Sequence, residues 1–214
     1  MVATLIIGAE LWERAPGRRN REQVVLFNIA TTATVVIGVA ALYAVLLVLA
    51  LRAANAHANA LQALDDGGVR GVRFNFVRHL GGAPDKAVFD RVIDRIRGRG
   101  WHVVLHMDAS DIEPLSGMIR ALPVPFVIDH MGRVDTTLGT GQPAFRALLD
   151  LARLDNCWIK VSGSERISAY PFDAAVPFAA ALVEAIPDRV LWGTDFPHPN
   201  LKVEVSEADL VDLV

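Results

Sequence analysis

Two patterns of hydrophobic and polar residues divide the chain. Residues 24–51 form an apolar run without a charged side chain, whereas residues 55–214 alternate short apolar runs with longer amphipathic stretches. The first pattern is typical of a long apolar helix, and the second of strands that alternate with helices. The sequence therefore predicts an N-terminal segment, residues 1–54, and a separate α/β domain, residues 55–214.

The apolar run is long enough to cross a membrane. It contains 28 residues, and a bilayer core of about 30 Å needs roughly 20 helical residues. We predict a single transmembrane-like helix over residues 24–51, a membrane localisation, and the membrane as a partner. A buried helix of a soluble domain and β-strands rich in Val and Thr are the alternatives. The charged residues that flank the run are Arg18, Arg19, Arg21, Glu22 and Arg52.

Strands and helices alternate regularly in the α/β domain. Repetition of this kind requires a parallel sheet with right-handed crossovers, either an open doubly wound sheet or a (β/α)8 barrel. Asp85 is placed to cap the first helix, whose apolar face is predicted to hold Val88, Val92 and Ile96. The predicted strands are 69–76, 102–106, 126–130, 158–161 and 190–192. The predicted helices are 85–99, 111–122, 143–154 and 173–186.

Composition narrows the choice of function. With 52% hydrophobic residues and a mean hydropathy of +0.34, the chain is too apolar to be disordered. A net charge of −3 gives no electrostatic reason to expect a nucleic-acid partner. The single cysteine, Cys157, excludes an internal disulfide and a cysteine zinc cluster, and is predicted to be a core residue. The absence of a glycine-rich phosphate loop disfavours a Rossmann-like nucleotide-binding protein.

Polar side chains follow every predicted strand. The carboxyl ends of parallel strands share one face, and that face carries the active site in such folds. Arginine and histidine side chains around an aspartate suit an anionic substrate. For Glu165 a simple ion pair with Arg166 is the alternative to a role in the site. Asp129 is expected to point away from His130 and to cap or bond nearby backbone. The polar set comprises Arg73, Asn75, Arg78, His79, His106, Asp108, Asp129, His130, Arg133, Ser162, Glu165, Arg166, Thr194, Asp195 and His198.

Four strings carry a resemblance to a known family. They are RGVRFNFV (70–77), VIDHMGR (127–133), WIKVSGSERIS (158–168) and VLWGTDFPHPN (190–200). They resemble the amidohydrolase-related family, and within it the 2-pyrone-4,6-dicarboxylate lactonase branch, over about residues 60–205. The resemblance implies a (β/α)8 barrel that hydrolyses esters, lactones or amides at its C-terminal face. Because about five β-α units are visible, we expect a partial TIM barrel. The H-x-H pair of the family's first strand is absent from the chain.

The resemblance assigns roles to individual side chains. Asp195 matches the aspartate that activates the hydrolytic water, and His130 matches the histidine that polarises or orients the substrate carbonyl. Arginines at matching positions hold substrate carboxylates and the developing oxyanion. The residues expected to bind substrate are Arg73, Arg78, His106, Arg133, Arg166 and His198.

The expected function is hydrolysis of a carboxylated lactone or ester through water activation at Asp195. The alternative is a non-catalytic membrane-anchored remnant, or a fusion of a truncated amidohydrolase, that keeps an inherited fold. No cofactor is expected, with a divalent metal as the alternative. The residues available to such an ion are His106, His130, His198 and Asp195, which make an incomplete ligand set. Missing strands would leave two sheet edges, so an oligomer is expected. The hydrolase relatives implied by the resemblance are cytoplasmic.

Overall fold

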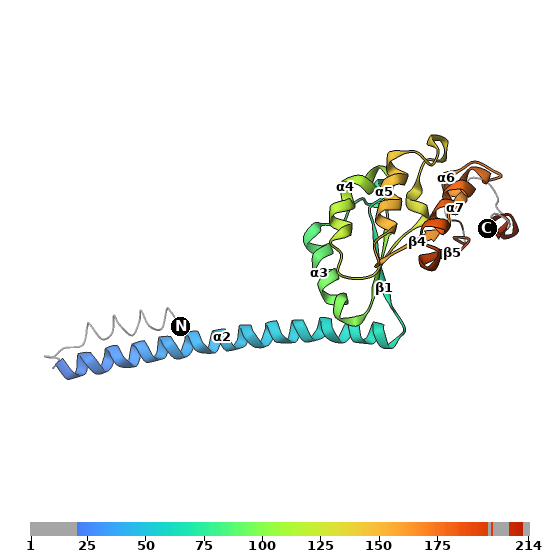
Figure 1. The fold of residues 1–214 in the computed structure, drawn as a ribbon. Coiled ribbons are helices and arrows are strands. Elements are labelled where there is room, and N and C mark those ends of the chain that lie inside the picture. The colour runs from blue at the N-terminus through green and yellow to red at the C-terminus, as the bar shows by residue number, and fades with distance from the viewer. Residues whose placement is uncertain (1–20, 197, 199–205, 212–214) are drawn as a thin grey trace. The chain divides into compact units, whose positions relative to one another are not determined.

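The computed structural model describes residues 21–196, 198 and 206–211 (Figure 1). The chain divides into two compact units, with the boundary between residues 69 and 70. The boundary predicted after residue 54 falls instead inside a continuous helix. The second unit holds the sheet and all of the predicted site residues.

Helix α2, Arg21–Asp66, is a single helix of 46 residues. It contains the whole apolar run 24–51, and the large apolar side chains of residues 36–51 are exposed on every side of it. The helix continues through the alanine-rich stretch 53–60, because alanine is the strongest helix former. Within the described residues, one helical stretch, Val36–Asp66 of α2, is long and apolar enough to cross a membrane, and an 18-residue segment of it has a mean hydropathy of 2.4.

The second unit is built on a parallel sheet of five strands in the order β1-β2-β3-β4-β5. All five predicted strands are therefore confirmed, with small shifts at their ends. Each connection moves one strand further in the same direction, whereas a doubly wound sheet reverses its direction partway. Of the two predicted architectures, the strand order favours the barrel type. The bounds are β1 Gly71–Asn75, β2 His102–His106, β3 Phe126–Ile128, β4 Cys157–Val161 and β5 Val190–Trp192.

The crossover helices follow one another around the strands (Figure 1). Helix α4 packs against α5, and α5 packs against α7 and β4. The core lies between these helices and the sheet; there the rings of Phe145 and Phe178 meet at 4.8 Å and join α5 to α7. The α-helices are α3 Lys86–Ile96, α4 Ala109–Arg120, α5 Pro143–Ala152, α6 Ser164–Ile167, α7 Val176–Ala185 and α8 Glu207–Val211. The 3-10 segments are η1 Arg78–Leu80, η2 Arg97–Arg99, η3 His130–Arg133, η4 Thr136–Leu138, η5 Asp173–Ala175 and η6 Pro187–Arg189.

The buried face of α3 differs from the predicted one. Its N-cap is as predicted, since the Asp85 side chain accepts a hydrogen bond from the backbone N–H of Val88 at 3.0 Å. Val88 itself, however, is 43% exposed, whereas Phe89 and Ile96 are buried. The reason is the larger apolar area of Phe89, whose ring lies 4.5 Å from the ring of Phe74 on β1.

One arginine ties together the amino-terminal ends of two strands. Arg189, just before β5, donates through Nη1 to the carbonyl oxygens of Ala152 and Cys157, each at 2.8 Å, and to that of Leu154. These carbonyls belong to the segment that leads into β4, and without the arginine they would lack this donor. The contact lies at the end of the sheet opposite to the polar residues that follow the strands.

Cys157, the first residue of β4, is a core residue, as predicted. Burial raises the pKa of its thiol to about 12, and the nearby Arg189 offsets only part of that rise. The side chain therefore stays a neutral thiol near pH 7 and packs as a small apolar group.

Candidate functional site

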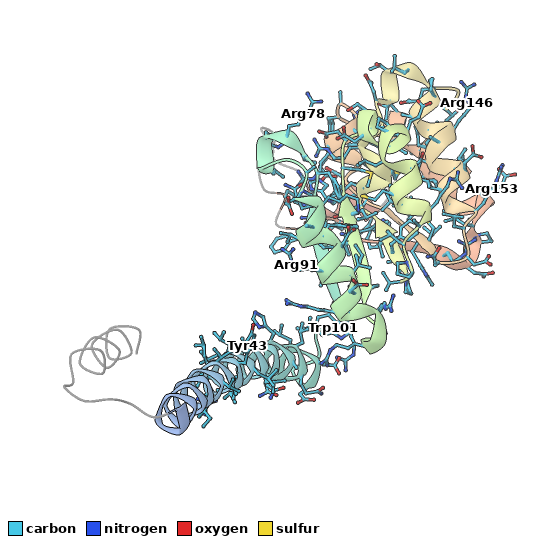
Figure 2. All side chains as sticks on the ribbon, turned by 90° about the vertical axis from the view of Figure 1, so that its left-hand side faces the viewer. Tyr43, Arg78, Arg91, Trp101, Arg146 and Arg153 are labelled. Carbon is cyan, nitrogen blue, oxygen red and sulfur yellow. The ribbon has the colours of Figure 1, made fainter. Side chains whose placement is uncertain are left out.

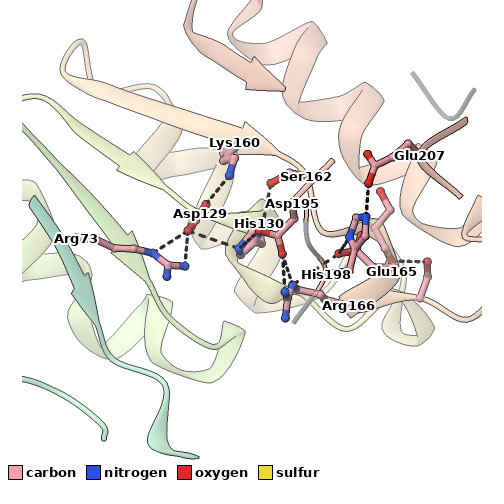
Figure 3. A network of polar contacts seen from close by, with 12 residues as sticks. Arg73, Asp129, His130, Lys160, Ser162, Glu165, Arg166, Asp195, His198 and Glu207 are labelled. Atoms are coloured by element: carbon pink, nitrogen blue, oxygen red, sulfur yellow. Dashed lines mark hydrogen bonds and ion pairs between the residues drawn. The ribbon is translucent and has the colours of Figure 1, made fainter. Parts of the chain in front are cut away.

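Polar side chains on or just after four strands, β1, β3, β4 and β5, meet at the carboxyl end of the sheet (Figure 3). Strand β3 is shorter than predicted and ends at Ile128, so that Asp129 and His130 lie in the turn beyond it. Asp129 contacts side chains from β1 and β4, while His130 contacts Ser162 after β4 and Asp195 after β5. The turn after β3 is thus the centre of the network.

Asp129 is a buried carboxylate that two cationic side chains and one imidazole approach. Its Oδ2 accepts from Arg73 Nε at 3.1 Å and Nη2 at 2.6 Å. Lys160 Nζ lies 3.6 Å from Oδ1, and His130 Nε2 lies 3.5 Å from Oδ2. Burial acts to raise the pKa of this carboxyl, but the neighbouring cations outweigh burial and hold the pKa below its usual value. The expectation that Asp129 would turn away and bond backbone is therefore wrong.

His130 is a buried imidazole between a hydroxyl and two carboxylates. Its Nδ1 lies 3.0 Å from Ser162 Oγ, and its Nε2 lies 3.7 Å from Asp195 Oδ1. Burial, together with the charges of Lys160 and Arg166, lowers the pKa of His130 below its ordinary value, although Asp129 and Asp195 act to raise it. The ring is therefore neutral near pH 7, and it can donate a hydrogen bond through one nitrogen while it accepts one through the other.

The turn that carries His130 has an unusual backbone. His130, Met131, Gly132 and Arg133 have φ values of 51°, 51°, 64° and 50°, so four consecutive residues are left-handed. A non-glycine residue in this region costs roughly 1–2 kcal/mol, and such strain persists where surrounding packing enforces it, often at functional sites. At Gly132 a Cβ would lie 2.8 Å from Ile112 Cδ1, so the glycine also admits close packing of α4.

Gly163 fixes the position of the His130 ring, and its replacement gives a testable prediction. Gly163 has φ +73°, and a Cβ there would lie 2.9 Å from His130 Nδ1. We expect Gly163→Ala to lower the free energy of unfolding by about 2–3 kcal/mol, from backbone strain and displacement of the ring. Urea unfolding would measure the loss.

Gly100→Ala is the matched control for this prediction. Gly100 has φ +70°, but a Cβ there meets nothing within 4 Å. In Gly100→Ala the free energy of unfolding should fall only by the cost of backbone strain, about 1 kcal/mol. Equal losses in the two variants would show that the contact with His130 carries no energy.

Arg166 and Asp195 form a partly buried ion pair. Arg166 donates through Nε at 2.6 Å and contacts through Nη2 at 2.5 Å, and both nitrogens meet the same oxygen, Asp195 Oδ2. The two side chains are 16% and 19% exposed. Asp195 is also left-handed, with φ +66°. Its Oδ1 faces His130, so the carboxylate lies between the guanidinium and the imidazole.

Glu165 is an acid enclosed behind this ion pair. Among the described residues, neither of its carboxyl oxygens has a hydrogen-bond partner; Arg166 Nε lies 3.6 Å away and His198 Nδ1 3.8 Å away. Burial raises its pKa despite those neighbours, which favours the neutral acid. The carboxyl lines a cavity of about 370 Å³ beside α7 and β5. His198 Nε2 lies 2.6 Å from Glu207 Oε1, which ties the turn after β5 to α8.

His106 and Arg133 lie at the β2 side of the site. The buried His106 ring meets the His130 ring edge-on at 5.4 Å, and neither of its nitrogens has a hydrogen-bond partner in the part of the chain that the structure describes. Burial first, and then the charges of Arg73, His130 and Arg133, lower the pKa of His106 to about 4. Arg133 donates through Nε to Asp108 Oδ1 at 2.8 Å.

The predicted site residues do not all enter the network. The exposed Arg78 projects outward from η1 and has none of the contacts drawn in Figure 3 (Figure 2). Sequence reasoning missed Lys160, although β4 carried a signal: Cys157, Ile159 and Val161 are buried on one face, so the alternate Lys160 must lie on the other. The residues joined by polar or ring contacts are Asp195, His130, Arg73, Arg166, His198 and His106, while Arg133 pairs with Asp108.

The donor set does not fit a metal ion. Within the described part of the chain, no group of three or more His, Cys, Asp or Glu side chains is arranged to hold one. Asp129 and Asp195 each face a guanidinium instead.

Comparisons with known proteins agree on one family. A family model described as amidohydrolase matches residues 21–214. A 2-pyrone-4,6-dicarboxylate hydrolase of Comamonas testosteroni is 44% identical over 162 residues, 71% of this chain and 53% of that protein. A 4-sulfomuconolactone hydrolase of Rhizobium radiobacter is 43% identical over 160 residues, 72% and 54% of the two chains. The chain thus spans about half the length of the curated relatives it matches.

Solved structures give the same result. A Pseudomonas putida structure assigned to the 2-pyrone-4,6-dicarboxylic acid hydrolases superposes with a TM-score of 0.62 at 34% identity, covering 72% of this chain and 58% of the other. An Acinetobacter baumannii structure with the same assignment, which contains citric acid, has a TM-score of 0.61 at 26% identity and covers 72% and 59%.

Proposed function

The chain belongs to the amidohydrolase family, and from that membership and the strand-end network we propose that it hydrolyses a carboxylated lactone or ester. One observation carries the proposal: the Asp195 carboxylate lies beside the buried, neutral His130, with an arginine in direct contact. A carboxylate can take a proton from water, while arginine and imidazole groups stabilise the oxyanion that forms.

The proposal includes the architecture. The five parallel strands would be an arc of a (β/α)8 barrel, whose active site lies at the carboxyl ends of its strands. Support comes from the sequential strand order and from the superposition on the Pseudomonas putida structure.

The reaction can be written from the groups present. The water oxygen bonds to the lactone carbonyl carbon, and a water proton passes to Asp195. His130 donates a hydrogen bond to the carbonyl oxygen, which becomes the oxyanion. The ring C–O bond then breaks, and the leaving oxygen takes the proton from Asp195. The product is a single ring-opened molecule that carries the new carboxylic acid at one end and the released hydroxyl, or its keto tautomer, at the other, so water is the only other reactant.

The proposed substrate carries at least one anionic group. The names of the two curated relatives contain a dicarboxylate and a sulfonate, and the Acinetobacter baumannii structure contains a tricarboxylic acid. In this chain Arg73, Arg133 and Arg166 lie on three different elements, β1, η3 and α6. Guanidinium groups bind planar carboxylates with two parallel hydrogen bonds. A flat lactone with one or two carboxylates fits this chemistry best.

A direct assay tests the proposal. Purified full-length protein would be mixed with 2-pyrone-4,6-dicarboxylate and, separately, with 4-sulfomuconolactone, with and without a chelator, and loss of ring absorbance followed. We expect turnover above buffer that the chelator does not change. A folded protein that turns over neither lactone would contradict the proposal and favour the non-catalytic alternative.

Replacement of Arg133 tests carboxylate recognition. We expect Arg133→Met to raise KM for the carboxylated lactone about 10–100-fold, because a hydrogen bond to a charged group contributes about 1.5–3 kcal/mol. The effect on an uncharged ester should be smaller. Arg78→Met is the control, because Arg78 is exposed and outside the network. Equal changes in KM for the charged and uncharged substrates would contradict a role for Arg133 in carboxylate binding.

We also propose that α2 is a membrane helix. Its large apolar side chains between residues 36 and 51 are exposed all round, and a helix of that kind is stable when protein or lipid covers it. We expect the chain to stay with membranes during extraction with alkaline carbonate. Release of the full chain alongside soluble markers would contradict the proposal.

Paired arginine substitutions make the membrane test specific. Ile37→Arg with Val39→Arg should abolish retention, since each charge near mid-bilayer costs about 2.5–3.5 kcal/mol on insertion scales. Ala56→Arg with Ala58→Arg has the same spacing in the same helix but lies beyond the apolar run. This control should remain with the membrane.

A further inference from the structure

The ion pair between Arg166 and Asp195 has an unequal geometry. Arg166 Nε and Nη2 both meet Asp195 Oδ2, at 2.6 and 2.5 Å, while Asp195 Oδ1 faces His130 Nε2 at 3.7 Å. The guanidinium fork therefore contacts one oxygen of the carboxylate, although its shape matches two.

A second carboxylate could make the better contact. A planar substrate carboxylate that presents both oxygens to Nε and Nη2 forms two parallel hydrogen bonds, the geometry that arginine favours. The second oxygen of Asp195 faces His130 Nε2 at 3.7 Å instead of the guanidinium. Both partners are less than one-fifth exposed, so the exchange would occur where solvent screens the charges only partly.

We propose that Arg166 is a specificity-determining residue that exchanges partners: it holds the Asp195 carboxylate and moves to the carboxylate of the substrate, which frees Asp195 Oδ2 to take a proton from water. The inference rests on the proposed hydrolase function. No proton is transferred and no covalent bond changes in the exchange; one ion pair replaces another. A substrate without an anionic group leaves Asp195 paired with Arg166. Such a substrate should therefore both bind more weakly and react more slowly in the chemical step.

The other arginine pairs of the site are less suited to this role. The partner of Arg73 is Asp129, a buried carboxylate that Lys160 and His130 also face. If Arg73 moved to a substrate, Lys160 would still neutralise Asp129. The partner of Arg133 is Asp108, which is not the proposed base. Only at Arg166 does the exchange release the group that the reaction needs.

The exchange is tested by a double-mutant cycle on binding, without hydrolysis. The probe is isophthalate, a planar dicarboxylate that contains no lactone or ester bond. Isothermal titration would give its Kd for the parent, Asp195→Asn, Arg166→Met and the double variant. If Asp195 competes for Arg166, Asp195→Asn should tighten isophthalate binding about tenfold, and this gain should vanish in the Arg166→Met background.

If Asp195 only repels isophthalate and does not compete for Arg166, the double-mutant cycle should give a different pattern of Kd values. Without Arg166 to neutralise it, Asp195 would repel a dianion more strongly, so the gain from Asp195→Asn would be equal or larger in the Arg166→Met background. That result overturns the exchange. Arg166→Lys provides a second background if the methionine variant does not fold, because lysine keeps the charge but lacks the fork. There too the gain should disappear.

A surface pair supplies the matched control. Arg153 Nη1 and Asp150 Oδ1 lie 3.1 Å apart at the end of α5, and both side chains are exposed (Figure 2). Asp150→Asn and Arg153→Met should leave the Kd for isophthalate unchanged.

The outcomes separate the two proposals. Binding with the predicted coupling but without lactone turnover would contradict the hydrolase function and support the exchange. Lactone turnover by the parent, together with tighter isophthalate binding on Asp195→Asn that persists in the Arg166 variants, would support the hydrolase function and contradict the exchange. Failure of the parent to bind isophthalate at all would overturn the exchange.

Discussion

The Asp195→Asn variant should hydrolyse the lactone about 10²–10⁴-fold more slowly in kcat than the parent, which is the usual contribution of a general base. The substitution keeps the size of the side chain and removes its basic oxygen. Asparagine also tolerates the left-handed backbone at this position, where φ is +66°, so the turn after β5 should keep its shape. Loss of ring absorbance at saturating substrate measures kcat directly.

A surface carboxylate provides the reference for this result. Asp150→Asn also removes one negative charge, from the exposed end of α5. Its kcat should equal that of the parent, and the thermal unfolding curves of both variants should show that the fold is retained. If Asp195→Asn hydrolyses as fast as the parent, Asp195 is not the base.

Acidification should lower the free energy of unfolding, because His106 is buried as a neutral ring. Its pKa is about 4 in the folded protein, against 6.5 as its ordinary value. Between these two values the unfolded chain holds a proton on this residue that the folded chain lacks, so stability falls as the pH falls. The full difference corresponds to about 3 kcal/mol of unfolding free energy, present above pH 6.5 and lost by pH 4.

His106→Phe isolates this contribution. Phenylalanine fills a similar volume, has no group to protonate, and replaces two ring nitrogens that have no hydrogen-bond partner. Urea unfolding at several pH values between 7 and 4 should show a parent stability that declines by about 3 kcal/mol more than that of the variant. His79→Phe, at an exposed histidine on η1, should follow the parent. Parallel curves for the parent and His106→Phe would contradict the assignment.

Much of the fold could be predicted because its signals are local. All five strands are short β-branched runs between turn residues, and the cap of α3 is a single aspartate. The length of α2 was underestimated, since the apolar run marks only the part of the helix that is hydrophobic. The buried face of α3 was predicted wrongly because spacing alone cannot show which of two overlapping stripes, with Val88 or with Phe89, meets the sheet.

The candidate site was harder to predict, because its geometry depends on where β3 ends. Extending the strand to His130 placed Asp129 on the opposite side from the histidine, whereas the strand stops at Ile128 and a left-handed turn follows. No local sequence signal shows four consecutive left-handed residues when only one of them is glycine. Lys160 could have been found from the alternation in β4, but its partner Asp129 is 31 positions away and becomes visible only in the fold.

The position of Arg189 has an evolutionary consequence. Its hydrogen bonds to the segment before β4 lie at the amino-terminal end of the sheet, and the loops with Asp195, Arg166 and His130 lie at the carboxyl end. Substitutions in the carboxyl-end loops can therefore change which substrate binds, while the Arg189 hydrogen bonds at the amino-terminal end keep the strands in register. Laboratory evolution toward other lactones should accumulate its changes around the strand-end loops and leave the arginine untouched, which makes the molecule a tolerant starting point for new specificities.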